Sequence, residues 1–279
     1  MQFTTLLCAL LLCAFAAPAE TLRVMSFNVR YPASGDGPNR WEVRQDTLVR
    51  TIRLKNPDLL GTQELFYIQG DYIAQNLPEY EWFGNSRRGN REDEHMGVFY
   101  KRSKLRVIES GNFWLSETPE VAGSQAWGAT LPRMVTWALF EIRASGQRFY
   151  FYNTHFHHTA QGNEARVNSA RLIAERAGKL PAGVPFIMTG DFNAAAPATD
   201  PYKILTANLK DAWTTATRTI GPAGTSSGFS GRVSDRRIDW ILYRGPFTVL
   251  EAETVTYNED GRYPSDHYPV LAVFELQPR

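Results

Sequence analysis

The stretch FIMTGDFN, residues 186–193, joins an apolar run to a polar tip and sets the interpretation of the whole sequence. Residues 186–191 are typical of a buried strand. Asp191 and Asn193 lie two positions apart, so their side chains point the same way if the backbone is extended. Asp191 can then hold and activate a water molecule while Asn193 donates to a phosphoryl oxygen. The alternative is a simple Asx-turn, in which Asp and Asn are common.

Other predicted strand ends carry the same kinds of side chain. They are Phe27-Asn28, Gln63-Glu64, Thr154-His155, Arg237-Ile238-Asp239 and Ser265-Asp266-His267. Strand ends can converge on one edge of a sheet, where α/β proteins commonly bind ligands. Carboxylates, amides and imidazoles gathered there suit metal-assisted attack on a phosphate ester.

Glu64 is the first candidate metal ligand, because a carboxylate at a buried strand end is costly unless it is paired or bound to a cation. A hard ion such as Mg²⁺ prefers oxygen ligands of this kind. Asn28 either adds an oxygen ligand, positions Glu64 or only forms the turn before Tyr31-Pro32. Asp266 is expected to reach the same metal.

The histidines are the candidate acid, base and phosphate-binding groups. His155 ends a predicted strand and can donate to negative charge developing on phosphorus, with Glu94 as a candidate orienting partner. Asp239 is embedded in an apolar run, so it needs a partner, and His267 is the natural one. An imidazole bound to a carboxylate suits general acid–base work near neutral pH.

The remaining patterns predict many strands and a few helices. Strands are expected at residues 22–29, 59–64, 81–83, 96–100, 105–111, 134–142, 148–155, 186–191, 209–213, 238–243, 249–255 and 270–276. Helices are expected at 41–54, 66–77 and 163–180, and the run from 81 to 155 is predicted to be antiparallel with hairpin-like connections. The simplest architecture is two packed mixed sheets with helices on the outer faces.

Residues 1–19 are predicted to be a secretory signal cleaved after Ala19. An apolar stretch runs from Leu6 to Phe15, and Ala17-Pro18-Ala19 places small residues where a signal peptidase cleaves. The alternative is a short N-terminal anchor, but the run is shorter than a comfortable membrane span. We therefore expect an exported chain, periplasmic or extracellular, without a stable membrane span.

Residues 20–279 are expected to form a single domain. Cys8 and Cys13 both fall within the predicted signal, so the mature chain has neither disulfides nor thiolate ligands, and its core must hold it together. The formal net charge of +1 gives no overall basic field for gripping long nucleic acid. We expect a monomer.

In this order, the polar strand ends resemble those of the endonuclease/exonuclease/phosphatase superfamily, the DNase I-like metal-dependent phosphoesterases. The segments DGPNRW (36–41), FWLSETP (113–119) and GRYPSDH (261–267) are similar to those of its small secreted bacterial members. The resemblance implies an α/β fold, a four-layer α/β/β/α sandwich of two packed mixed β-sheets flanked by helices. The chain departs from the family at His157, where members of this group often have Asp.

The resemblance also implies roles for the candidate residues. Glu64 would bind an essential Mg²⁺ or Mn²⁺ ion with help from Asn28 and Asp266. Asp191 would orient or deprotonate the attacking water, and Asn193 would contact the phosphate.

The histidines take the remaining roles under the same resemblance. His155, positioned by Glu94, would stabilise the pentacovalent transition state. His267, paired with Asp239, would serve as a second acid/base or phosphate contact.

The favoured interpretation is a phosphodiesterase or nuclease-like hydrolase whose partner is a phosphate ester, a nucleic acid or a nucleotide included. Cations and aromatic rings that could serve nucleotide binding are Arg87, Arg88, Arg91, Arg133, Trp114 and Trp127. The alternatives are a phosphomonoesterase acting on a small molecule and a sphingomyelinase-like lipid phosphodiesterase. A non-catalytic binding protein on the same fold is disfavoured because no catalytic residue is missing.

Overall fold

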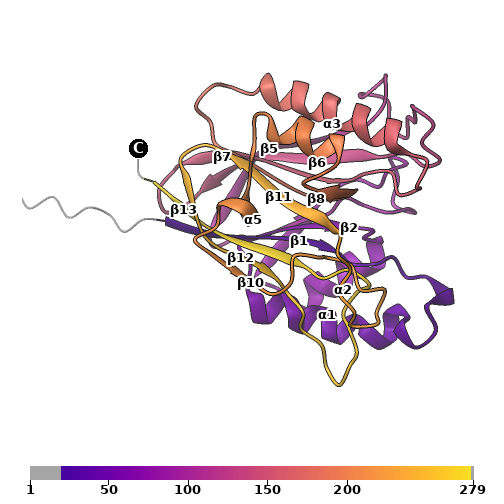
Figure 1. Cartoon of the computed structure of the whole chain (residues 1–279). Coiled ribbons are helices and arrows are strands. Elements are labelled where there is room, and N and C mark those ends of the chain that lie inside the picture. Colours follow the sequence, from indigo (N-terminus) through magenta and orange to yellow (C-terminus); the bar gives the residue numbers. More distant parts are fainter. Residues whose placement is uncertain (1–19, 278–279) are drawn as a thin grey trace, which may run out of the picture.

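The chain folds into two β-sheets packed face to face, with helices on their outer faces (Figure 1). The computed structural model describes residues 20–277, so the predicted signal at 1–19 lies outside the described residues. Within the described residues, no helix is long and apolar enough to cross a membrane. The predicted architecture of two packed mixed sheets flanked by helices is confirmed.

The first sheet is built around the first strand of the domain. Its strands, in spatial order, are β10 (Arg218–Ile220), β12 (Phe247–Thr254), β13 (Val270–Leu276), β1 (Glu20–Asn28), β2 (Leu59–Gln63), β4 (Val98–Lys101) and β3 (Tyr80–Phe83). β1 runs parallel to β2 and antiparallel to β13, which makes the sheet mixed.

The second sheet contains the stretch FIMTGDFN, residues 186–193. Its strands, in spatial order, are β5 (Leu105–Trp114), β6 (Met134–Ile142), β7 (Arg148–His155), β8 (Phe186–Ala196), β11 (Arg237–Arg244) and β9 (Lys210–Asp211). β7 and β8 are parallel, so His155 and Asp191 are register partners at the same end of the sheet.

Helices complete the outer layers. They are the 3₁₀ segment η1 (Ser34–Asn39), α1 (Trp41–Lys55), α2 (Tyr67–Asn76), α3 (Asn163–Gly178), α4 (Asp200–Thr206) and the short α5 (Ala212–Thr215). α1 and α2 lie on the first sheet and α3 lies on the second, at opposite sides of the molecule (Figure 1).

Alternating side chains explain this layering. In β1, Leu22 and Val24 enter the apolar cluster between the sheets, whereas Met25 and Phe27 enter the cluster beneath α1 and α2. A strand that is apolar on both faces must be covered on both faces, because successive side chains point to opposite sides. The pattern of β1 therefore requires a second sheet on one side and helices on the other.

The antiparallel run predicted over residues 81–155 divides between the two sheets. β3 pairs with β4 in the first sheet, whereas β5, β6 and β7 form antiparallel pairs in the second. The strand predicted at 209–213 is correct only at Lys210–Asp211, after which the chain turns into α5. The sequence patterns also missed α4, β10 and η1.

A seam of buried polar side chains joins the two sheets behind the polar strand ends. Gln63 Nε2 on β2 donates to Asn153 Oδ1 on β7 (2.7 Å), and Thr189 Oγ1 on β8 donates to the same oxygen (3.0 Å). Asn153 Nδ2 in turn donates to the carbonyl of Thr62 at 2.7 Å. Because these groups are buried, their mutual hydrogen bonds fix how the sheets sit against each other.

The seam predicts a cost for any side chain added at Gly61. A Cβ there would lie 2.1 Å from Thr189 Oγ1 and 2.6 Å from Asn153 Oδ1. We expect Gly61→Ala to lower the free energy of unfolding by about 1–3 kcal/mol, the usual cost of overpacking a core. Urea denaturation measures it. Gly178→Ala is the control, because nothing lies within 4 Å of a Cβ at that helical position. Equal stability of the two variants would contradict the prediction.

Candidate active site

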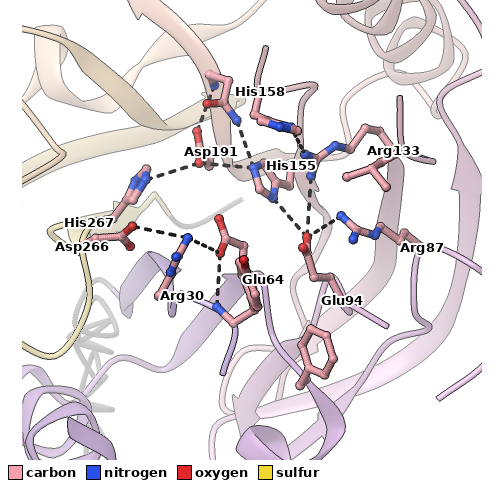
Figure 2. Close-up of a pocket in the computed structure, with 14 residues that line it drawn as sticks. Arg30, Glu64, Arg87, Glu94, Arg133, His155, His158, Asp191, Asp266 and His267 are labelled. Atoms are coloured by element: carbon pink, nitrogen blue, oxygen red, sulfur yellow. Dashed lines mark hydrogen bonds and ion pairs between the residues drawn. The ribbon is translucent and has the colours of Figure 1, made fainter. Parts of the chain in front are cut away.

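A polar cavity of about 510 Å³ opens where the strand ends of both sheets meet (Figure 2). The predicted site residues that line it are Glu64, Glu94, His155, Asp191, Asn193, Asp266 and His267. Its other lining residues are Arg30, Tyr31, Phe66, Arg87, Leu131, Arg133 and His158. The structure therefore brings most of the predicted residues together; Asn28 and Asp239 lie behind them, in contact with residues that line the cavity.

Asn28, at the end of β1, connects the two sheets at the cavity floor. Its Nδ2 donates to Glu64 Oε1 and to Asp191 Oδ2, both at 3.0 Å. Glu64 follows β2 in the first sheet and Asp191 lies on β8 in the second. Asn28 therefore positions both carboxylates, one of the roles that the sequence left open for it.

Asn193 lines the cavity, but its backbone conformation differs from the extended one considered in the sequence analysis. Its backbone is not extended but left-handed (φ 48°), and its N–H donates to Asp191 Oδ1 at 2.9 Å. The Asx-turn considered as the alternative is therefore the local structure, and the two side chains do not share an extended strand face. Asn193 Nδ2 nevertheless lies 3.0 Å from His155 Nε2, within the cavity.

His267 and Asp239 form the predicted pair. His267 Nδ1 lies 3.0 Å from Asp239 Oδ2, and its Nε2 lies 3.8 Å from Asp191 Oδ2. Burial opposes the charged imidazole, but the carboxylates of Asp239 and Asp191 outweigh burial and raise the pKa of His267 well above its ordinary value. The two carboxylates therefore favour the charged form of His267.

For Asp191, burial is the main cause of the pKa shift and the neighbouring imidazole opposes it. Burial, and then the negative charge of Asp239, raise its pKa to about 7, while His267 partly counters them. A carboxyl group with a pKa near neutrality can take a proton from water at physiological pH.

His155 stays neutral. Burial, and then the positive charge of Arg133, lower its pKa well below the ordinary value. Its Nδ1 lies 3.9 Å from Glu94 Oε2, close enough for electrostatic contact but longer than a hydrogen bond. Glu94 is nearer to Arg87, whose Nη1 lies 2.9 Å from the same oxygen. The predicted partner of His155 is thus shared with an arginine.

A buried cationic wall surrounds Glu94. The side chains of Arg87 and Arg133 are 9% and 4% exposed. Arg87 forms ion pairs with Glu94 Oε2 and with Asp93 Oδ1, both at 2.9 Å, and Arg133 Nη1 lies 3.8 Å from Glu94 Oε2. Both arginines line the cavity, and guanidinium groups there suit an anionic ligand.

Arg30 is the main functional candidate that sequence reasoning missed. Its Nε and Nη2 donate to Asp36 at 3.0 and 2.8 Å. Its Nη1 lies 3.9 Å from Glu64 Oε2 and 3.8 Å from Asp266 Oδ2, between the two carboxylates (Figure 2). Its place two residues after Asn28 was the available signal.

Three cavity residues have backbones in the left-handed region. These are Arg30 (φ 54°), Glu64 (φ 58°) and Asn193 (φ 48°). Non-glycine residues are uncommon there, and such strain tends to gather at functional sites. Each conformation turns a side chain at a strand end into the cavity.

Buried Arg44 of α1 holds the loops around Arg30 and Asp266. It donates to the carbonyls of Val29 (2.7 Å), Arg30 (2.6 Å) and Pro264 (2.8 Å). Since Pro264 precedes the Ser265-Asp266-His267 triplet, one guanidinium fixes two segments of the site.

Other predicted candidates lie elsewhere. Gln63 belongs to the buried seam, and Trp114 is a core residue, 5% exposed, whose indole donates to the carbonyl of Arg87. His157 is buried and lies 2.9 Å from Thr159 Oγ1. The neighbouring His158, which the sequence did not single out, lines the cavity and lies 3.2 Å from Arg133 Nη2.

The donor set fits a hard divalent cation. Asp191, Asp239 and His267 each offer a ligand atom within 4.8 Å of the others, which makes them a possible metal site. Glu64 and Asp266 offer further carboxylate oxygens, and both approach the same nitrogen of Arg30. Oxygen-rich sites of this kind suit Mg²⁺ or Mn²⁺. The ligand set Asn28, Glu64 and Asp266 stays a prediction.

Residues 25–267 match the endonuclease/exonuclease/phosphatase family, and the chain belongs to that family. With this fold and this cavity, it is a metal-dependent phosphoester hydrolase. The expected resemblance is confirmed.

Solved structures place the chain among bacterial members. An endonuclease/exonuclease/phosphatase family protein from Bacteroides thetaiotaomicron aligns with a TM-score of 0.89 at 31% identity, covering 94% of this chain and 100% of that one. A mannosyl-6-phosphatase from the same species aligns with a TM-score of 0.85 at 32% identity, covering 91% and 99%. D. rerio TDP2, solved with a single-strand DNA product, aligns with a TM-score of 0.72 at 20% identity, covering 91% and 99%, and shows the shared fold alone.

A curated relative is more distant. An uncharacterized protein of Acanthamoeba polyphaga mimivirus is 27% identical over 247 residues, which are 74% of this chain. The chain spans 36% of the length of that relative.

The His267–Asp239 pair predicts a measurable change in titration. Asp239→Asn removes the carboxylate bound to Nδ1, which is the main group that favours the charged imidazole. Burial, which favours the neutral form, is then less opposed, so the pKa of His267 should fall toward or below 6.5. NMR titration of the histidine ring protons in metal-free protein measures it. Asp235→Asn, at an exposed position, is the control. An unchanged His267 titration in Asp239→Asn would show that the pairing does not hold the charge.

Proposed function

We propose that the chain is a phosphomonoesterase that removes phosphate from a small phosphorylated molecule. The observation that carries this proposal is the pair of guanidinium groups, those of Arg87 and Arg133, that line the cavity beside Glu94. A monoester brings three terminal oxygens and about two negative charges at pH 7, which suits this cationic wall better than a diester does. The likeness to a mannosyl-6-phosphatase at 32% identity supports it.

Three of the six residues predicted for nucleotide binding make contacts within the protein instead. Trp114 is buried, Arg88 donates to Asp93, and the guanidinium of Arg91 lies 4.7 Å from the ring centre of Tyr67. Stacking of bases needs exposed rings, and tracking of a backbone needs free cations. These contacts favour the small-molecule alternative over the nuclease-like interpretation.

We place the metal at Glu64 and Asp266. His267 is a poor ligand while it carries a proton on each ring nitrogen, because a metal needs a free lone pair. Glu64 is held by Asn28 and by the backbone N–H of Tyr31 (3.2 Å), with its carboxylate lining the cavity. A bound Mg²⁺ or Mn²⁺ ion would supply Lewis-acid stabilisation of charge on the phosphoryl and leaving oxygens.

The residues of the chain then divide the reaction among them. Asp191, held by Asn28 and the backbone N–H of Asn193, accepts a proton from the attacking water. The imidazolium of His267 faces the charge that develops on the phosphoryl oxygens, and Asp239 holds its orientation. Asn193 on β8 and neutral His155 on β7, 3.0 Å apart between Nδ2 and Nε2, are the uncharged polar groups beside them. In-line attack forms the new P–O bond as the ester P–O bond breaks on the opposite side, so the configuration at phosphorus inverts and the leaving oxygen takes up a proton to become an alcohol.

Export remains part of the proposal. The apolar run and the small residues at 17–19 support cleavage after Ala19 and a location in the periplasm or outside the cell. Mass spectrometry of the N-terminus after expression and fractionation tests it; a mature protein that retains residues 1–19 in the cytoplasm would refute it.

Activity measurements test the proposed reaction. The protein spanning residues 20–279 should release phosphate from monoesters with Mg²⁺ or Mn²⁺ and not with EDTA. Asp191→Asn and His267→Gln should each lower kcat by about 10²–10⁴-fold, the usual contribution of a positioned acid or base. Glu117→Gln, at an exposed position, is the control. Faster cleavage of diesters, DNA, RNA or sphingomyelin would replace the phosphatase with the corresponding phosphodiesterase.

Metal binding gives an independent prediction. A ligand at 100 times its Kd stabilises a protein by about 2.7 kcal/mol, so saturating Mn²⁺ should raise Tm. Glu64→Ala should abolish that rise, whereas Glu117→Ala should retain it. A rise that survives in Glu64→Ala would place the ion elsewhere.

A further inference from the structure

A second hollow, of about 540 Å³, adjoins the catalytic cavity. The loop of residues 31–36 and Phe66 form its walls together with Arg30. Arg30, Tyr31 and Phe66 line both spaces, so a ligand in one can extend into the other. No role in the proposed mechanism uses this hollow.

One wall of the hollow is a fixed pair of opposite charges. Asp36 accepts hydrogen bonds from two nitrogens of Arg30, at 3.0 and 2.8 Å. The carbonyl of Arg30 accepts from Arg44 Nη2 at 2.6 Å and from Gln69 Nε2 at 2.9 Å. The pair is thus anchored from behind, while Asp36 and Arg30 keep 10% and 24% of their side-chain surface exposed. The carboxylate can accept further hydrogen bonds there, and the guanidinium can donate them.

Two aromatic rings also line the hollow, and the guanidinium carbon of Arg30 lies 4.5 Å from the centre of the Tyr31 ring, which leaves Phe66 as the ring away from that charge. The rings of Tyr31 and Phe66 lie 6.2 Å apart between centroids with an interplanar angle of 33°, and both side chains are half-buried. A site with aromatic surface on one side and a few fixed polar groups on the other orients a ligand that has both kinds of face. A pyranose ring is such a ligand, because its C–H face is apolar and its rim carries hydroxyl groups that donate and accept.

The hollow also lies next to Glu64, the carboxylate proposed to hold the metal ion that faces the leaving oxygen. The backbone N–H of Tyr31 donates to Glu64 Oε2 at 3.2 Å, and Arg30 lies between Glu64 and Asp266 (Figure 2). The cationic wall of Arg87 and Arg133 lies on the far side of Glu64 from Arg30 in the same view. Because the two spaces share Arg30, Tyr31 and Phe66, a phosphate ester bound in the cavity can extend its other group into the hollow.

We propose that the hollow bounded by residues 31–36 and Phe66 is the leaving-group subsite and takes a polyhydroxylated ring. Asp36 and Arg30 bind its hydroxyl groups, and Phe66 packs against its apolar face. This inference rests on the proposed phosphatase function and names the substrate class of the same site.

Steady-state kinetics with two kinds of probe test the subsite. Hexose 6-phosphate fills both spaces, whereas inorganic phosphate, used as a competitive inhibitor, fills the phosphate position alone. Phe66→Ala and Asp36→Asn should each raise the KM for hexose 6-phosphate by about tenfold, because contacts with rings and charged groups are lost. The Ki of phosphate should stay within about twofold for Phe66→Ala, which does not touch the charged groups. Asp235→Asn, an exposed aspartate away from the hollow, is the matched control.

The possible failures are distinguishable. An unchanged KM for hexose 6-phosphate in both variants would overturn the subsite. Hydrolysis of n-hexyl phosphate, which has a comparable alkoxide leaving group but no hydroxyl groups, with a kcat/KM at or above that for hexose 6-phosphates would overturn the sugar class while the phosphatase function stands. A protein that turns over none of these monoesters would overturn both.

Discussion

The site depends on the side-chain amide of Asn28, which donates to one carboxylate on each sheet. Glu64 and Asp191 would otherwise repel each other across the interface, and a shared donor offsets part of that repulsion while fixing their separation. The arrangement requires the two sheets to keep one relative position. The buried seam of Gln63, Asn153 and Thr189 provides that constraint a short way behind the site.

The stability of the rest of the fold offsets the cost of buried charges and strained backbones at the site. Arginines 87 and 133 are buried, each with an Nε that makes no hydrogen bond, and three cavity residues hold left-handed backbones. Such features cost of order 1–3 kcal/mol each, so they persist only where the surroundings determine them. The extensive apolar clusters between the sheets and under the helices supply that stability. The strained and charged groups gather where the chemistry is proposed.

The sequence predicted most of the fold and the core of the site for clear physical reasons. Strands with long apolar patterns, such as Met134–Ile142, match the structure residue for residue. The pair of Asp239 and His267 was predictable because a carboxylate in an apolar run needs a partner. The features that the sequence did not predict depend on contacts between residues far apart in the chain. Nothing local reveals that β4 and β5 enter different sheets, or that Arg30 and Asn193 adopt left-handed backbones. Arg30 therefore went unnoticed, although it lies between two predicted ligands.

In the proposed mechanism, Asn28 holds the metal-binding carboxylate of Glu64 and the water-activating carboxylate of Asp191 apart. Anomalous diffraction from crystals grown with Mn²⁺ and phosphate tests this arrangement. We expect a manganese peak within bonding distance of carboxylate oxygens of Glu64 and Asp266. We also expect phosphate in contact with that ion, His267, Asn193 and the guanidinium of Arg87 or Arg133, with Asp191 free of the metal. A manganese ion bound by Asp239 and His267, with Glu64 outside its coordination sphere, would contradict it.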